Sequence, residues 1–140
     1  MFITEEPIVV GTAAEPAPDT RNGAVVSFTG VVRNHDGGRP VTGIYYDCYR
    51  AIAEREVAAM VEDIRVAFGV DSISARHRVG EVGVGEIALL VVVSATHRRE
   101  AFDACQAVID RIKKRVPIWK KQRYADAAAK WLAESPGRTD

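Results

Sequence analysis

The stretch EIALLVVVSA, Glu86 to Ala95, contains the longest apolar run of the sequence and decides the expected fold. The run itself, Ile87 to Val93, has seven residues, far fewer than the roughly 20 that cross a bilayer as a helix. Its length and its β-branched residues favour a strand buried in a sheet. We therefore expect a core built around this strand.

Further strands are expected on both sides of it. Residues 24–33, 41–49 and 71–80 are predicted to be strands, and residues 118–125 are predicted to be extended. Residues 2–10 alternate weakly and contain a proline, which indicates at most an edge strand. The connecting segments are rich in turn-forming residues and are expected to be loops or turns: 11–23, 34–40 and the GEVGVGE stretch at 80–86.

The spacing of apolar residues changes to a helical period in two segments. Ala51 to Phe68 is predicted to be a helix, and Gly69 is its expected C-terminal cap. A second helix is expected to be capped by Thr96, to run to about Arg115 and to end before Pro117. One apolar stripe is expected along the second helix: Phe102, Cys105, Ile109, Ile112 and Val116.

These elements predict an α+β fold, with a mixed, mostly antiparallel sheet and two main helices packed on it in the order β-β-β-α-β-β-α-β. A chain of 140 residues is expected to form one domain, residues 1–134, with a last helical turn around Trp131 and a flexible tail at 135–140. The N-terminus has no basic region followed by a long apolar one, so a cytoplasmic location without membrane contact is expected.

Positive charge is concentrated in RIKKRVPIWKKQR, Arg111 to Arg123, where seven of thirteen residues are basic and none is acidic. The whole chain balances 19 Lys and Arg against 19 Asp and Glu. At about 100° per residue, Lys114 lies opposite the apolar stripe and is expected in solvent, whereas Lys113 lies about 80° from its centre. Two interpretations of Lys113 stay open: its side chain snorkels at the core edge, or it reaches into a cleft.

Other cationic side chains stand at the ends of separate elements. Arg33 closes a predicted strand, His97 and Arg98 open the second helix, and Lys120 lies beyond Pro117. Free N–H groups at a helix start attract anions, so this start is either an anion site or an exposed first turn without a ligand. Together these cations suggest a pocket for a small phosphate or carboxylate ligand.

Other kinds of site are disfavoured. His35, His77 and His97 have no partner at metal-ligand spacing, so no metal site is expected. Neither a Ser-His-Asp nor a GxSxG arrangement is found. Cys48 and Cys105 lie on apolar faces of their elements and are expected in the core rather than as nucleophiles.

Four stretches carry a resemblance to a known family: GAVVSFTGVVRNHD, HRVGEVGVGE, SATHRREAF and KKRVPIWKK. In order and spacing, over roughly residues 23–121, they resemble the large (catalytic) subunit of molybdopterin synthase. The resemblance implies a sulfurtransferase that needs no cofactor. It would convert cyclic pyranopterin monophosphate to molybdopterin, with sulfur from the thiocarboxylated C-terminus of a small ubiquitin-like subunit.

The resemblance also implies roles and partners. Lys113 and Lys120 match the two functional lysines of the family. Arg33, His97 and Arg98 match residues that hold the anionic pterin, with Lys121 next to the pocket. The large subunit would form a homodimer, and a heterotetramer with two small subunits.

Two alternatives remain. One is a non-catalytic paralogue that only binds the small subunit. The other is a nucleic-acid binder that uses the basic stretch, with Trp119 and Tyr124 as stacking surfaces. The zero net charge argues against general nucleic-acid binding.

Overall fold

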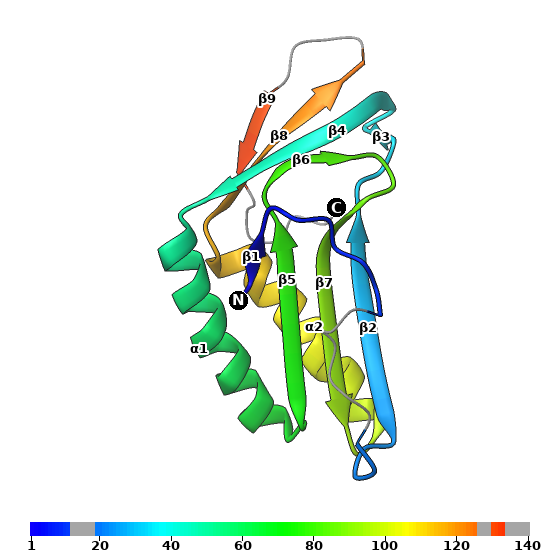
Figure 1. Ribbon diagram of the computed structural model, residues 1–140, viewed down its shortest axis with the longest axis vertical. Helices are drawn as coiled ribbons and strands as arrows, with labels where there is room; N and C mark the ends of the chain where they lie inside the picture. The colour runs from blue at the N-terminus through cyan, green and yellow to red at the C-terminus, as the bar shows by residue number, and fades with distance from the viewer. Residues whose placement is uncertain (12–18, 126–129, 134–140) are drawn as a thin grey trace.

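The computed structural model describes residues 1–11, 19–125 and 130–133. The elements in chain order are β1 (Ile3–Thr4), β2 (Ala24–Val31), β3 (His35–Asp36), β4 (Arg39–Cys48), α1 (Arg50–Phe68), β5 (Ser72–Arg78), β6 (Gly80–Gly83), β7 (Ile87–Ala95), α2 (Arg98–Arg115), β8 (Ile118–Tyr124) and β9 (Lys130–Ala133). The long elements follow the predicted order, and the α+β class is confirmed. The strands divide between two sheets, the second lying across one end of the first (Figure 1).

The predicted buried strand, β7, is an interior strand of the first sheet, whose order is β1-β5-β7-β2. Both β2 and β5 run antiparallel to β7, and Val26 and Ile73 both lie opposite Val93. Every residue of β7 after Ile87 is buried. The apolar run therefore forms the centre of the core, as predicted.

The N-terminal strand is shorter than predicted, although its place at a sheet edge is confirmed. Of residues 2–10, only Ile3–Thr4 pairs, in parallel with β5. The backbone N–H groups of Phe2 and Ile3 donate instead to the carboxylate of Glu54 on α1, at 2.6 and 3.1 Å. A side chain of the first helix thus ties down the start of the chain.

The second sheet has the order β3-β4-β8-β9, with β6 also paired to β4. The GEVGVGE stretch was expected to be only a hairpin turn, but Gly80–Gly83 forms β6 and lies antiparallel to β4, with Val82 opposite Ile44. The turn itself falls at Val84 and Gly85, and Gly85 has a φ of +85°. The chain therefore passes from the first sheet to the second and back within this stretch.

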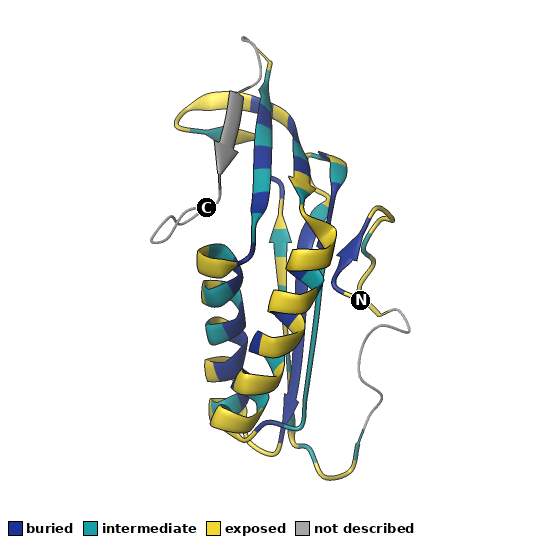
Figure 2. Cartoon of the chain, turned by 90° about the vertical axis from the view of Figure 1, so that its left-hand side faces the viewer, coloured by how far each residue is buried: buried dark blue, intermediate teal, exposed yellow. Residues whose placement is uncertain are grey.

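Both helices cover one face of the first sheet and turn their buried sides toward it (Figures 1 and 2). The first helix buries Ala53, Val57, Met60 and Ile64. It ends as predicted at Gly69, which has a φ of +67° and donates its N–H to the Val66 carbonyl.

Two details of the second helix differ from the prediction. Phe102 is 60% exposed, because the face against the sheet is formed by smaller residues: Ala101, Ala104, Cys105, Val108 and Ile112. Small side chains allow a helix backbone to approach a sheet closely. The helix therefore packs through these residues, and Phe102 lies outside the buried face. The N-cap residue is His97 rather than Thr96, and its side chain makes no capping hydrogen bond.

Near the C-terminus, the helical turn expected around Trp131 is wrong. Lys130–Ala133 forms β9, antiparallel to β8, with Trp131 opposite Lys121. The free edge of β8 offers backbone partners that a single isolated turn of helix does not have. Residues 12–18 of the predicted loop and the predicted tail at 135–140 lie outside the described residues.

Candidate functional site

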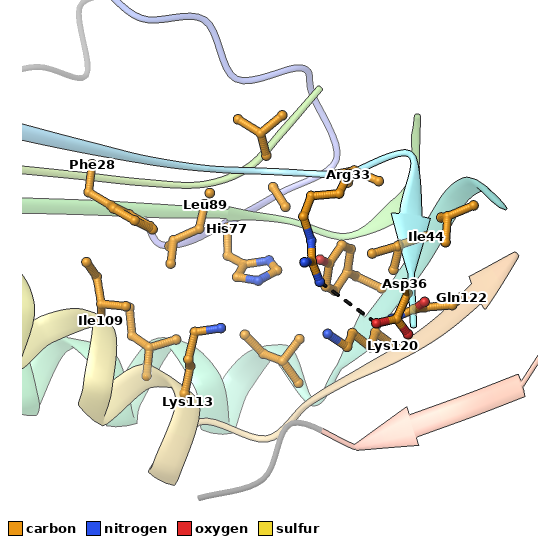
Figure 3. Close-up of a pocket in the computed structure, with 18 of the residues that line it drawn as sticks. Phe28, Arg33, Asp36, Ile44, His77, Leu89, Ile109, Lys113, Lys120 and Gln122 are labelled. Atoms are coloured by element: carbon orange, nitrogen blue, oxygen red, sulfur yellow. Dashed lines mark ion pairs between the residues drawn. The ribbon is translucent and has the colours of Figure 1, made fainter. Parts of the chain in front are cut away.

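A pocket of about 360 Å³ lies where the first sheet, the second sheet and the C-terminal half of α2 meet (Figure 3). The polar and charged side chains among its lining residues are Arg33, His35, Asp36, Tyr46, His77, Gln106, Asp110, Lys113, Lys120 and Gln122. Apolar residues such as Phe28, Leu89 and Ile109 form the rest of the wall. An enclosure of this kind strengthens the electrostatic interactions of the charged groups inside it.

The basic stretch reaches this pocket through two lysines on different elements. The second helix ends at Arg115, and Val116 adopts an extended conformation before Pro117. Lys113, in the last turn of the helix, is half-buried and points into the pocket (Figure 3). Lys120, on β8, lines the same pocket and is only 2% exposed.

The other basic residues of the stretch mostly face away from the pocket. Lys114 is exposed, as predicted from its position on the helix. Alternation along β8 buries Ile118, Lys120 and Gln122 on one side. Across the sheet, Tyr46 lies opposite Lys120 and Ile44 lies opposite Gln122, so these paired residues of β4 and β8 form one wall of the pocket.

Arg33 contributes a third cation. It follows β2 and lies across the pocket from Lys113 (Figure 3). Its guanidinium lies 3.9 Å from the carboxylate of Asp36. The hydroxyl of Tyr124 donates to Asp36 at 3.1 Å, and the guanidinium of Arg39 lies 3.7 Å from the centre of the Tyr124 ring. Arg33 itself is half-exposed, so it stands at the mouth of the pocket.

Of the polar side chains in the pocket, the sequence interpretation gave only Arg33, Lys113 and Lys120 as site residues, and two of the others, His77 and Gln122, are buried. His77 is 6% exposed, and its pKa is lowered to about 4, mainly by burial. Gln122 is 4% exposed, and its side-chain oxygen is buried without a hydrogen-bond partner among the described residues. The strand period of two, which places Gln122 on the side of Lys120, was the available signal.

The remaining predicted site residues do not reach this pocket within one chain. His97 and Arg98 are exposed at the start of α2, sixteen and fifteen residues before Lys113. At 1.5 Å per residue, the helix separates His97 from Lys113 by roughly 24 Å. Lys121 lies on the opposite side of β8 from Lys120 and does not line the pocket.

Neither cysteine is placed to act as a nucleophile in this pocket. Cys105 is buried, and burial raises the pKa of its thiol. Cys48 is half-buried, and burial together with the charge of Asp47 raises the pKa of its thiol.

The described residues contain no group of three or more His, Cys, Asp or Glu side chains able to hold a metal ion. Within the same part of the chain, no helix is long and apolar enough to cross a membrane.

Comparison with known proteins gives consistent matches over most of the chain. The family described as MoaE protein matches residues 3–115. The molybdopterin synthase catalytic subunit of Nostoc sp. is 39% identical over 132 residues, which cover 94% of this chain and 80% of that protein. Catalytic subunit 1 of Mycobacterium tuberculosis is 33% identical over 141 residues, covering 96% of this chain and 90% of that protein.

Solved structures agree. Molybdopterin synthase from Staphylococcus aureus superimposes with a TM-score of 0.86 at 36% identity, covering 94% of this chain and 95% of that one. A complex of subunits 1 and 2 of the molybdopterin-converting factor from Helicobacter pylori gives a TM-score of 0.63 at 26% identity, covering 76% of this chain and 73% of that one.

Proposed function

The chain belongs to the MoaE protein family, and from this membership and its pocket we propose that it transfers sulfur to cyclic pyranopterin monophosphate. The sulfur comes from the thiocarboxylated C-terminus of a small ubiquitin-like subunit. The product is molybdopterin, which carries the sulfurs as a dithiolene, so the reaction is a step of molybdenum cofactor biosynthesis. The observation that carries the proposal is the meeting of Lys113, Lys120 and Arg33 in one pocket.

The charges of the pocket suit this chemistry. The cyclic phosphate and the thiocarboxylate are both anions, and cationic donors bind such groups through strong charge-assisted hydrogen bonds. The thiocarboxylate sulfur forms a bond to a substrate carbon and displaces an oxygen from it, and the ammonium groups of Lys113 and Lys120 stabilise the negative charge that this moves onto the substrate. Water then cleaves the bond between this sulfur and the acyl carbon, which leaves a carboxylate at the C-terminus of the small subunit. The donor subunit supplies the sulfur, so the reaction needs no cysteine nucleophile from this chain. This agrees with the burial of Cys105 and the raised pKa of both thiols.

The positions of His97 and Arg98 suggest how a homodimer would take part. Both residues lie too far along α2 to reach the pocket of their own chain. We assign them to the pocket of a second copy, where their exposed side chains would meet the anionic substrate. The Helicobacter pylori complex supports a small-subunit partner, and two such partners on a homodimer would make a heterotetramer.

The test is reconstitution with a thiocarboxylated small subunit and cyclic pyranopterin monophosphate, assayed for molybdopterin. Lys113→Ala is expected to lower turnover at least about 100-fold, because a half-buried cation is removed from the reacting centre. Lys114→Ala is the matched control, since it removes the adjacent but exposed lysine. Normal turnover by Lys113→Ala would contradict the assignment.

Two other outcomes would favour the alternatives. A stable complex with the small subunit but no product from the unaltered protein would indicate a non-catalytic paralogue. Salt-sensitive oligonucleotide binding without product would indicate a nucleic-acid binder. The cytoplasmic location and the 1–134 domain boundary stay predictions, which cell fractionation and limited proteolysis would check.

A further inference from the structure

His77 lies among the cations of the pocket, and the proposed sulfur transfer assigns it no role. It is the penultimate residue of β5, and its side chain is turned toward the helices. The imidazole packs edge-on against Tyr46, with ring centres 4.9 Å apart, and against Phe2, with ring centres 6.1 Å apart. These contacts hold the ring in one orientation, so its two nitrogens point in fixed directions.

The hydrogen bond at one ring nitrogen determines the chemistry of the other. The Nδ1 atom lies 2.7 Å from the backbone carbonyl oxygen of Arg78. A carbonyl oxygen can only accept, so Nδ1 must carry the hydrogen and donate it. The pKa of His77 is lowered to about 4 by burial and by the charges of Lys113 and Lys120, although the bond to Arg78 opposes this. The ring is therefore neutral at pH 7, and Nε2 at its tip has a free lone pair.

The surroundings of this lone pair are rich in hydrogen-bond donors. Figure 3 shows the imidazole pointing into the space between the ammonium groups of Lys113 and Lys120 and the guanidinium of Arg33. The titratable and charged groups that face this space are Asp110 and Lys113 from α2, Lys120 from β8, Tyr46 from β4, and Arg33, His35 and Asp36 from the segment after β2. A carboxylate among these cations would pair with them and cancel part of their charge, whereas a neutral imidazole accepts a hydrogen bond and leaves the charge intact.

We propose that His77 is a positioning residue for sulfur transfer: its Nε2 accepts a hydrogen bond from the ammonium of Lys113 and holds that group toward the reacting centre at full charge. Lys113 is the choice over Lys120 because it is the less buried of the two and extends from the end of α2 into the pocket below His77. The effect of His77 on sulfur transfer rests on the proposed function. The neutral state of its ring, with the hydrogen on Nδ1, does not depend on that function.

That premise can be tested without any turnover. In full-length protein labelled with ¹⁵N, the imidazole of His77 is expected at pH 7 in the neutral form with its hydrogen on Nδ1. The opposite tautomer, or a charged ring, would overturn the inference, because Nε2 would then be a donor. This measurement decides the question even if the protein proves to make no molybdopterin.

Two substitutions separate the pocket-facing nitrogen from the backbone-facing one. His77→Gln can place an amide oxygen near the position of Nε2, whereas His77→Asn keeps an N–H toward Arg78 and places nothing at the tip. His77→Asn is expected to lower kcat roughly 10- to 100-fold, the usual effect of losing a hydrogen bond to a charged group, while His77→Gln stays within a few-fold of the unaltered protein. Far-UV circular dichroism and thermal unfolding establish that both variants fold.

Recovery of kcat by His77→Gln gives a readout that a purely structural role would not produce. His77→Gln supplies an acceptor near the position of Nε2 and His77→Asn does not, so only His77→Gln is expected to retain kcat. The reverse order, with Asn active and Gln impaired, would show that only the bond to Arg78 matters and would overturn the proposal. No product from the unaltered protein would instead refute the proposed function. The tautomer of His77 would then still be tested by the ¹⁵N measurement.

Discussion

At the scale of single residues, the pocket depends on polar groups that are buried beside one another. Lys120 is 2% exposed, and Tyr46 lies opposite it across the sheet. Burying an ammonium group is costly unless other groups compensate, so such an arrangement is expected where the charge has a use. The burial of His77 as a neutral ring belongs to the same arrangement, and it has a measurable effect on stability.

Stability should fall with acid because of His77. Its pKa is about 4 in the folded chain, below the ordinary 6.5, so between these values the unfolded chain binds a proton that the folded chain does not. The neutral His77 ring makes its full contribution to the free energy of unfolding above pH 6.5, and this contribution is lost as the pH falls toward about 4. It amounts to about 3 kcal/mol. Urea unfolding at pH values between about 4 and 7 would measure this slope.

The same titration in His77→Gln should give a shallower slope over that range, because the ionisable ring is gone. His97→Gln removes an exposed histidine and should leave the slope as it is. Equal slopes in the unaltered protein and in His77→Gln would contradict the assignment of the effect to His77.

At the scale of elements, the break between α2 and β8 forms the site. The helix ends at Arg115 and the strand begins at Ile118, with Pro117 between them. Proline cannot continue a helix, and the residue before it favours an extended backbone. The six residues between Lys113 and Lys120 therefore change direction, and both lysines face one pocket. The sequence interpretation of this break is confirmed.

The end of α1 provides a test of the helix boundary. Gly69 has a φ of +67°, and a Cβ placed there would meet no atom within 4 Å, so backbone conformation alone restricts this position. Gly69→Ala is expected to lower the free energy of unfolding by roughly 1–2 kcal/mol, the cost of a left-handed conformation for an ordinary residue. Chemical denaturation checks this value. Gly69→Asn should cost less, since asparagine tolerates that conformation; a neutral Gly69→Ala would contradict the cap.

At the scale of the whole molecule, the length of α2 decides which residues can share a site. The helix places His97 and Arg98 at one end and Lys113 at the other, roughly 24 Å from His97 along the axis. If all of them serve one substrate, two copies of the chain must contribute to each pocket. Such a shared site can be recognised by mixing variants.

Arg98→Ala and Lys113→Ala are each expected to be nearly inactive as homodimers, and their mixture should regain activity. A mixed dimer would contain one pocket with both groups intact, so random exchange of subunits should restore about a quarter of the normal turnover. The measurement is molybdopterin formation after the two variants are denatured and refolded together, with each variant refolded alone as the control. No recovery in proven mixed dimers would place Arg98 outside the shared pocket.

The sequence by itself determined the features that depend on residues close together in the chain. The buried strand β7, both helices and the glycine cap at Gly69 follow from local apolar patterns and backbone preferences. The helical period separates an exposed Lys114 from a Lys113 beside the apolar stripe, and the structure then shows that Lys113 lines the pocket.

Only the tertiary structure decided the features that depend on pairing between distant segments. The backbone of Ile44 pairs with Val82 on one side and Gln122 on the other, and no local pattern specifies such a choice of partners. That pairing creates the second sheet, places Lys120 and Gln122 against the end of the first, and forms the pocket with His77 in its wall. A strand pattern indicates which face of a strand is buried, whereas the position of that face is set by the free energy of packing the whole chain.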